Sequence, residues 1–176
     1  MPGLSRKRIL LNPDYRDILS AFSEEHVEYL LVGAYALAAH GLVRATGDID
    51  LWVRTSEDNA ARIMDALARF GAPLHQIEAR DFETPGTVFQ IGVVLRRVDI
   101  LTSIDGVEFE EAWPERQEVE VAGLKVPVIG RHHLLQNKRA GLKTSLTPHG
   151  WLEMRKGIYS PHTADFEPNS GMISSP

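Results

Sequence analysis

The sequence predicts an α/β (α+β) domain in which helices flank a mixed β-sheet. The expected elements follow the order α-β-α-β-α-β-β, then a hairpin and a helix, a pattern typical of helices packed on a sheet that contains both strand directions. The chain has 176 residues, of which 43% are hydrophobic, so it is large enough for one globular domain with its own core.

Three elements are expected before residue 42. A helix is predicted over residues 12–26, where Asn12 can cap the helix and Pro13 suits its first position. Residues 27–33 are apolar almost throughout, which predicts a central strand. A short helix is expected over residues 34–41, where the terminal glycine ends it.

The next two elements have the clearest patterns in the chain. Residues 48–54 alternate between polar and apolar side chains, which predicts a strand with one buried face. Residues 55–71 predict a helix that Ser56 caps and Gly71 terminates.

The second half of the domain predicts smaller elements. They are two strands over residues 84–93 and 96–104, a short helical piece over 109–113, a hairpin over 118–130 and a last helix over 131–141.

The chain divides into two parts. Residues 142–176 contain four prolines, many serines and threonines, and no sustained apolar periodicity. We therefore expect one domain over residues 1–141, followed by a poorly structured tail, loosely ordered or divergent, over residues 142–176.

Charge and composition exclude several classes of protein. The net charge of −5 argues against a protein that coats nucleic acid without specificity, and the absence of cysteine excludes disulfides and cysteine-ligated zinc. The sequence shows no signal peptide and no run of the ~20 apolar residues that a membrane span needs. We expect a soluble, cytoplasmic protein with no membrane partner.

Two aspartates open the strand over residues 48–54. Asp48 and Asp50 lie two positions apart, so their side chains share one face of the strand, whereas Ile49 faces the core. Asp99 lies on another predicted strand, and if the two strands are neighbours, three carboxylates come together. Such a cluster is typical of a Mg²⁺ site, since Mg²⁺ is held by carboxylates and substrate phosphates. A solvated strand face that happens to carry acids is the alternative.

A glycine lies where the strand over residues 27–33 meets the next helix. Gly33 would let a ligand approach the backbone, and the helix that starts near Ala34 would offer free N–H groups to a phosphate. Together with the carboxylates, this turn predicts a site for a metal-bound polyphosphate.

This stretch resembles the nucleotidyltransferase superfamily with the DNA polymerase β-like fold, in particular its AbiEii-like branch of small bacterial proteins. The resemblance is to the pattern G-[GSA]-x-A-x-x-x-H-G-x-x-R-x-T-x-D-I-D and covers roughly residues 20–140. The matching residues are Gly33, Ala34, Ala36, His40, Gly41, Arg44, Thr46, Asp48 and Asp50. The segment that contains Asp99 resembles the third acidic motif, and the helix with Lys138 resembles a later one.

The resemblance implies transfer of a nucleoside monophosphate from a nucleoside triphosphate, such as ATP, to a hydroxyl acceptor. Asp48 and Asp50 would bind Mg²⁺ or Mn²⁺ on the nucleotide. Asp99 would complete a second metal site or activate the acceptor hydroxyl. The acceptor stays open: an RNA end, a protein or a small molecule. The branch also implies a toxin, with an antitoxin as partner.

The same resemblance places the nucleotide beside five residues. They are Gly33, Ala34, Arg44, Thr46 and Lys138.

The sequence departs from the family in two places. The family often has Gly or Ser at the position of Ala34, so here only backbone donors remain for a phosphate. After Ala140 the family continues with a basic and then an acidic stretch, whereas this chain has Lys143 and no following acid.

Several other residues have two interpretations. His40 is expected to bond a backbone carbonyl rather than a nucleotide. Trp52 shares the face of Asp48 and Asp50, so it would either stack on a base or cover the sheet. The adjacent His132 and His133 are expected on the surface. Arg96 and Arg97 are expected to be a charge pair at a strand end, with contact between one of them and substrate as the alternative. The acids Glu108, Glu110 and Glu111 are expected to be a solvated helix start.

Two other functions remain open. The first is a non-catalytic relative that keeps the fold as a binding module or as one component of a toxin–antitoxin pair, which the altered segment after Ala140 favours. The second is a phosphohydrolase of the haloacid dehalogenase type, which also uses two aspartates two residues apart. It ranks lower, because its second acid lies in a loop that leaves the strand, whereas here the strand continues.

Overall fold

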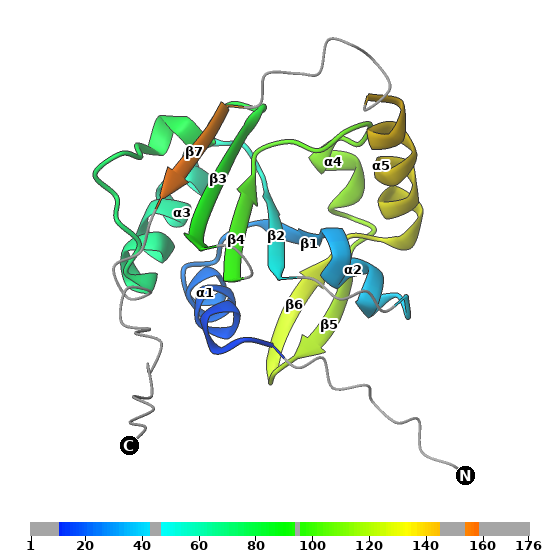
Figure 1. Ribbon diagram of the computed structural model, residues 1–176, viewed down its shortest axis with the longest axis horizontal. Coiled ribbons are helices and arrows are strands. Elements are labelled where there is room, and N and C mark those ends of the chain that lie inside the picture. Colours follow the sequence, from blue (N-terminus) through cyan, green and yellow to red (C-terminus); the bar gives the residue numbers. More distant parts are fainter. Residues whose placement is uncertain (1–10, 43–46, 94–95, 145–153, 159–176) are drawn as a thin grey trace, which may run out of the picture.

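One mixed β-sheet of seven strands runs through the part of the chain that the computed structural model describes, residues 11–42, 47–93, 96–144 and 154–158 (Figure 1). The elements in chain order are α1 (Pro13–Glu24), β1 (Tyr29–Val32), α2 (Gly33–Ala39), β2 (Asp48–Val53), α3 (Glu57–Phe70), the 3₁₀ turn η1 (Ala79–Phe82), β3 (Thr87–Val93), β4 (Arg96–Leu101), α4 (Phe109–Ala112), β5 (Gln117–Val121), β6 (Leu124–Val128), α5 (Arg131–Thr144) and β7 (Met154–Ile158). The α/β class with a mixed sheet is confirmed.

The strands lie in the order β5-β6-β1-β2-β4-β3-β7. β2 pairs antiparallel with β1 and parallel with β4. β3 returns antiparallel beside β4, and the hairpin β5–β6 joins β1 through β6. The strand that carries Asp99 is therefore the direct neighbour of the strand that carries Asp48 and Asp50, as the site prediction required.

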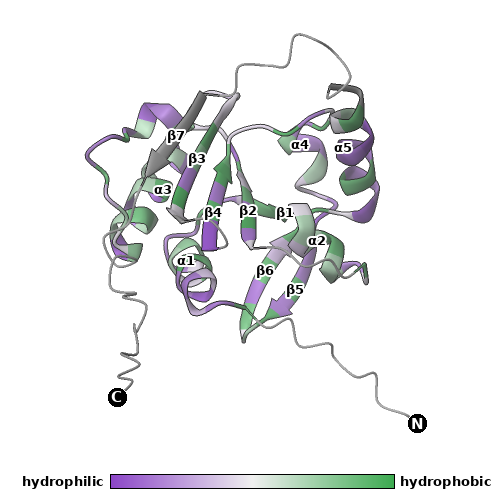
Figure 2. Ribbon diagram, in the orientation of Figure 1, coloured by the Kyte–Doolittle hydropathy of each residue, from purple (hydrophilic) through white to green (hydrophobic). Residues whose placement is uncertain are grey.

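Helices α1 and α3 and the turn η1 cover one face of the sheet. Tyr29 of β1 packs edge-on against Phe22 of α1, with ring centroids 5.2 Å apart. Phe89 of β3 packs against Phe82 of η1 with centroids 4.3 Å apart. Figure 2 shows apolar residues along the inner strands between these layers, and Ile49 is fully buried there. This face is the main hydrophobic core.

The opposite face is covered only in part. Trp52 of β2 packs edge-on against Phe109 of α4, with ring centroids 5.0 Å apart. α2 follows β1 directly and contacts both β1 and β2. The segment of β2 before Trp52 carries the aspartates on this second face.

The expected capping residues have their expected roles. The Asn12 side chain accepts a hydrogen bond from the backbone N–H of Asp14, and Pro13 begins α1. The Ser56 side chain accepts from the backbone N–H of Asn59, and Gly71 ends α3 in the left-handed conformation. These local signals determine where α1 and α3 begin and where α3 ends.

The segment over residues 142–176 contains structure that the sequence analysis did not find. α5 continues to Thr144, and Met154–Ile158 form β7, which pairs parallel with β3 over five positions. The rest of that segment lies outside the described residues. Five residues with one glycine give too short a pattern to predict a strand. None of the described helices is long and apolar enough to cross a membrane.

Candidate functional site

The structure brings the three predicted acids to one face of the sheet. Asp50 and Asp99 are direct partners in the parallel pairing of β2 with β4, and Asp48 lies opposite Arg97 in the same pairing. Residues opposite each other on neighbouring strands share a face, so the four side chains form one polar group. The name aspartate face is used below for Asp48, Asp50, Arg97 and Asp99.

Burial and repulsion act together on Asp50. Burial, followed by the negative charges of Asp99 and Asp48, raises the pKa of the Asp50 carboxyl to about 6, although Lys138 and Arg97 lower it in part. An acid with a raised pKa beside other acids is typical of a functional site. Asp99 is itself only 7% exposed, whereas the side chain of Asp48 is 35% exposed, so the aspartate face is buried at Asp99 and open at Asp48.

Arg97 has a different role from the strand-end charge pair that its sequence position predicts. Its Nε donates to Asp99 Oδ1 at 2.6 Å, and its Nη2 donates to Asp48 Oδ2 at 3.0 Å and to Asp99 Oδ2 at 3.1 Å. The hydrogen bond to Asp99 is the main cause that raises the pKa of the Arg97 guanidinium. Arg97 is therefore not part of a strand-end charge pair with Arg96, because it bridges two carboxylates at the centre of the site.

Gly33 lies against Asp50. Gly33 has φ +66°, and a β-carbon built on it would lie 2.0 Å from Asp50 Oδ2 and 2.8 Å from its carboxyl carbon. Only a residue without a side chain fits there. The immediate reason for glycine is thus the Asp50 carboxylate, and the approach of a phosphate remains a prediction.

The structure describes two of the other four residues that are predicted to contact the nucleotide. Ala34 lies in the first turn of α2, next to Gly33. Lys138 is exposed on α5, yet close enough for its charge to lower the pKa of Asp50. Arg44 and Thr46 lie outside the described residues.

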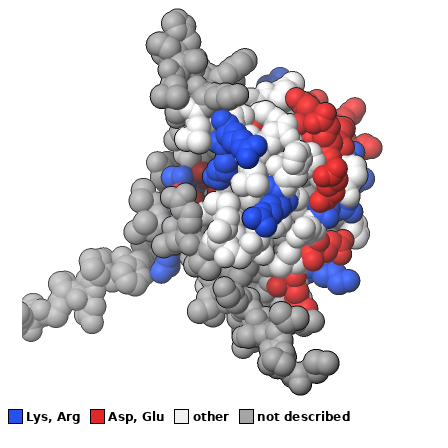
Figure 3. All heavy atoms as spheres, turned by 90° about the vertical axis from the view of Figure 1, so that its right-hand side faces the viewer, with Lys and Arg blue, Asp and Glu red and all other residues white. Residues whose placement is uncertain are grey.

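α5 presents a basic surface beside the aspartate face. Its sequence contains no acidic residue, and Arg131, Lys138 and Arg139 are exposed on it. Figure 3 shows Lys and Arg side chains over this side of the molecule, with Asp and Glu gathered to one side of them. Of these residues, Lys138 acts on the aspartate face, since its charge lowers the pKa of Asp50.

The donor set fits a divalent cation by its chemistry, because three carboxylates share one face. The positions of the side chains do not form a metal site, however. In the described part of the chain, no three His, Cys, Asp or Glu side chains are placed so that they could hold a metal ion together. Arg97 contacts these carboxylates instead: both oxygens of Asp99 and one of Asp48 accept hydrogen bonds from it.

Three of the other candidate residues, Trp52, His40 and His133, are part of the structural framework. Trp52 is 2% exposed beneath α4, so stacking on a base is wrong and covering the sheet is right. His40 Nε2 lies 2.8 Å from the carbonyl oxygen of Ile129, as expected. His132 is exposed, but His133 is 6% exposed, with Nδ1 3.6 Å from Glu115 Oε2, so its expected surface position is wrong.

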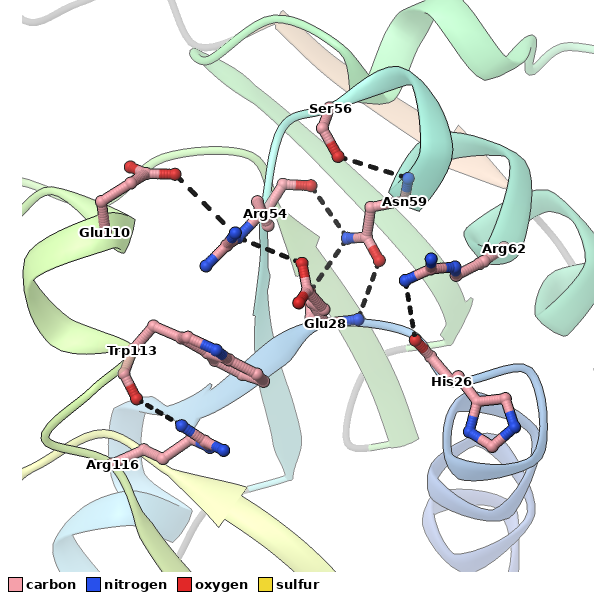
Figure 4. Close-up of polar contacts among 9 residues, drawn as sticks. All are labelled: His26, Glu28, Arg54, Ser56, Asn59, Arg62, Glu110, Trp113 and Arg116. Carbon is pink, nitrogen blue, oxygen red and sulfur yellow. Dashed lines mark hydrogen bonds and ion pairs between the residues drawn. The ribbon is translucent and has the colours of Figure 1, made fainter.

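A second polar cluster lies at the far end of β2 (Figure 4). Asn59 is 1% exposed, and its Oδ1 accepts from the Glu28 N–H at 2.8 Å. Its Nδ2 donates to the carbonyls of Glu28 at 3.0 Å and Arg54 at 2.9 Å. All these partners are main-chain groups at the ends of β1 and β2, so this cluster is structural.

The chain was compared with protein families, curated sequences and solved structures. No protein-family model matches the chain. No curated protein sequence matches it either. A crystal structure of a Thermotoga maritima protein, described as a “putative nucleotidyltransferase”, is 20% identical to this chain. The similarity covers 81% of this chain and 91% of that one, with a TM-score of 0.49.

Proposed function

We propose that the protein is a metal-dependent nucleotidyltransferase, which moves a nucleoside monophosphate from a nucleoside triphosphate to a hydroxyl acceptor. The observation that supports it best is the direct pairing of Asp50 with Asp99, with Asp48 two residues before Asp50 on the same face. Carboxylates that share a largely buried face repel one another unless a cation lies among them.

Each residue of the site has a role in this proposal. Asp48 and Asp50 would hold Mg²⁺ or Mn²⁺, which would supply positive charge to the triphosphate and polarise its α-phosphorus. Lys138 adds positive charge from α5, beside Asp50. Asp99 accepts the proton of the acceptor hydroxyl or joins a second metal site. The acceptor oxygen forms a bond to the α-phosphorus as the bond to the β-phosphate oxygen breaks, and pyrophosphate leaves.

One observation favours a second candidate function, a non-catalytic binding module such as a component of a toxin–antitoxin pair. Arg97 supplies a positive charge to Asp48 and Asp99 without any metal. A domain that had lost its cation would need such an internal charge to keep its acids folded together.

Incubation of the full chain with each of the four α-labelled nucleoside triphosphates and Mg²⁺ or Mn²⁺ tests the proposal. Candidate acceptors are RNA, protein and hydroxylated small molecules. Label on an acceptor together with released pyrophosphate supports the transferase. Nucleotide binding without transfer supports the binding module, and release of inorganic phosphate supports a phosphohydrolase.

Matched variants connect the result to the site. Asp50→Asn should lose both transfer and the rise in melting temperature that Mg²⁺ with nucleotide gives the wild type. Asp99→Asn should keep part of the nucleotide binding and lose transfer. Asp65→Asn makes the same chemical change at an exposed position of α3 and is the control. A wild type that neither binds nor transfers any nucleotide would contradict the proposal.

A further inference from the structure

Arg97 is placed where a cation would have to lie. We infer that Arg97 is an internal counter-ion that competes with a divalent cation for Asp48 and Asp99, so that cation binding requires Arg97 to leave them. This inference rests on the proposed function for the identity of the competitor, and it names a form of regulation at the same site.

The contacts of Arg97 take up three of the four carboxylate oxygens of Asp48 and Asp99. Asp99 accepts through both of its oxygens, Oδ1 at 2.6 Å and Oδ2 at 3.1 Å, and Asp48 accepts through Oδ2 at 3.0 Å. The planar guanidinium has several donors in a fixed fork and therefore bridges two carboxylates with good geometry. A lone pair directed at a guanidinium N–H is not free for a metal ion.

Arg97 cannot share the site with the cation. A guanidinium has no acceptor atom, so it cannot become a ligand. It is also positive, and a divalent cation bound to the same carboxylates would repel it at short range. The two occupants therefore exclude each other, although both satisfy Asp48 and Asp99.

The exposure of the three side chains makes the exchange feasible. The Arg97 side chain is 27% exposed, that of Asp48 35% and that of Asp99 10%. Asp99 is the buried anchor, whereas Arg97 has an edge in water into which it can move. Competition of this kind lowers the apparent affinity for the cation by the fraction of molecules in which Arg97 has left.

Binding of Mn²⁺ to the full chain without nucleotide tests the inference, with electron paramagnetic resonance to measure free Mn²⁺. Arg97→Gln removes the competitor and should bind Mn²⁺ about tenfold more tightly than the wild type. Arg96→Gln is the matched control, since it removes the same charge one position away, where the side chain is exposed. It should stay within about twofold of the wild type.

Two more variants keep the test decisive. Arg97→Lys keeps the charge but replaces the planar fork by a point charge, so it should bind Mn²⁺ about threefold more tightly than the wild type. This variant still tests the inference if Arg97→Gln fails to fold. The double variant Asp48→Asn with Arg97→Gln should lose the gain, which places the bound Mn²⁺ at Asp48.

The opposite results would overturn the inference. They are an Arg97→Gln variant that binds Mn²⁺ no more tightly than Arg96→Gln does, or an Arg97→Lys variant that folds and shows no shift. The proposed function fails separately: tighter Mn²⁺ binding by Arg97→Gln with no transfer by any form of the protein leaves the competition standing. If the wild type transfers nucleotide but Arg97→Gln does not bind Mn²⁺ more tightly, the inferred competition is wrong and the proposed function stands.

Discussion

The Asp50 carboxylate fills the space that a side chain at position 33 would need, because a β-carbon on Gly33 would lie 2.0 Å from Asp50 Oδ2. Gly33→Ala should therefore destabilise the protein by about 3 kcal/mol, in part through the left-handed backbone and in part through the collision. Urea denaturation measures the change.

The collision can be separated from the backbone strain. In an Asp50→Ala background the obstructing carboxylate is gone, and Gly33→Ala should cost only about 1 kcal/mol. A double-mutant cycle gives the difference as a coupling energy. Equal costs in both backgrounds would show that the two residues do not interact.

The raised pKa of Asp50 makes its effect on stability depend on pH. The pKa of the Asp50 carboxyl has its ordinary value of 3.8 in the unfolded chain and is raised to about 6 in the folded one, so between these values the native state binds more protons. The contribution of Asp50 to the free energy of unfolding therefore falls as pH rises through this window, by at most about 3 kcal/mol. In the absence of metal, Asp50→Asn should be more stable than the wild type at pH 7.5 and nearly equal to it at pH 4.

Denaturation of both proteins across that pH range measures the difference. Asp65→Asn, at an exposed position of α3, is the control and should show no comparable trend. A constant difference between Asp50→Asn and the wild type would contradict the assigned pKa.

Asn59 joins the ends of β1 and β2 through three side-chain hydrogen bonds. Asn59→Ala should cost about 3 kcal/mol, because it removes the partner of the Glu28 N–H and of the Arg54 carbonyl, whereas the Glu28 carbonyl keeps the Arg54 N–H. Asn137 bonds the Asp105 carbonyl in an exposed contact, so Asn137→Ala is the matched control and should cost under about 1 kcal/mol. Thermal and urea denaturation measure both, and equal losses would show that the buried network is not specially stabilising.

β7 extends the sheet beyond β3. Removal of residues 145–176 leaves β3 with an unpaired edge, so the melting temperature should fall by about 5 °C. Removal of residues 159–176 keeps β7 and serves as the control. If the two shortened proteins have the same melting temperature, β7 does not stabilise the domain.

Much of the site followed from local patterns. The alternation of residues 48–51 predicts that Asp48 and Asp50 share a face, and the capping residues Asn12 and Ser56 mark where helices begin. These signals act over a few residues, so the sequence contains them in full.

The role of Arg97 depends on how the strands pair, which local sequence patterns do not determine. Its position two residues before Asp99 predicts a shared face, but only the pairing of β4 with β2 places it opposite Asp48. The register between two strands is set by the whole sheet. The burial of Trp52 and His133 also depends on segments that are distant in the sequence. α4 covers Trp52, and the segment with Glu115 lies beside His133.

The parallel pairing of β2 with β4 also has a consequence for the order of events in folding. Arg97 and Asp48 meet across 49 positions of the chain, with α3, η1 and β3 between their strands. A contact over such a separation forms late, because a long loop must close before the pairing contributes any stability. The aspartate face therefore exists only once the central sheet is complete, and a cation that binds there can trap only molecules that have already folded.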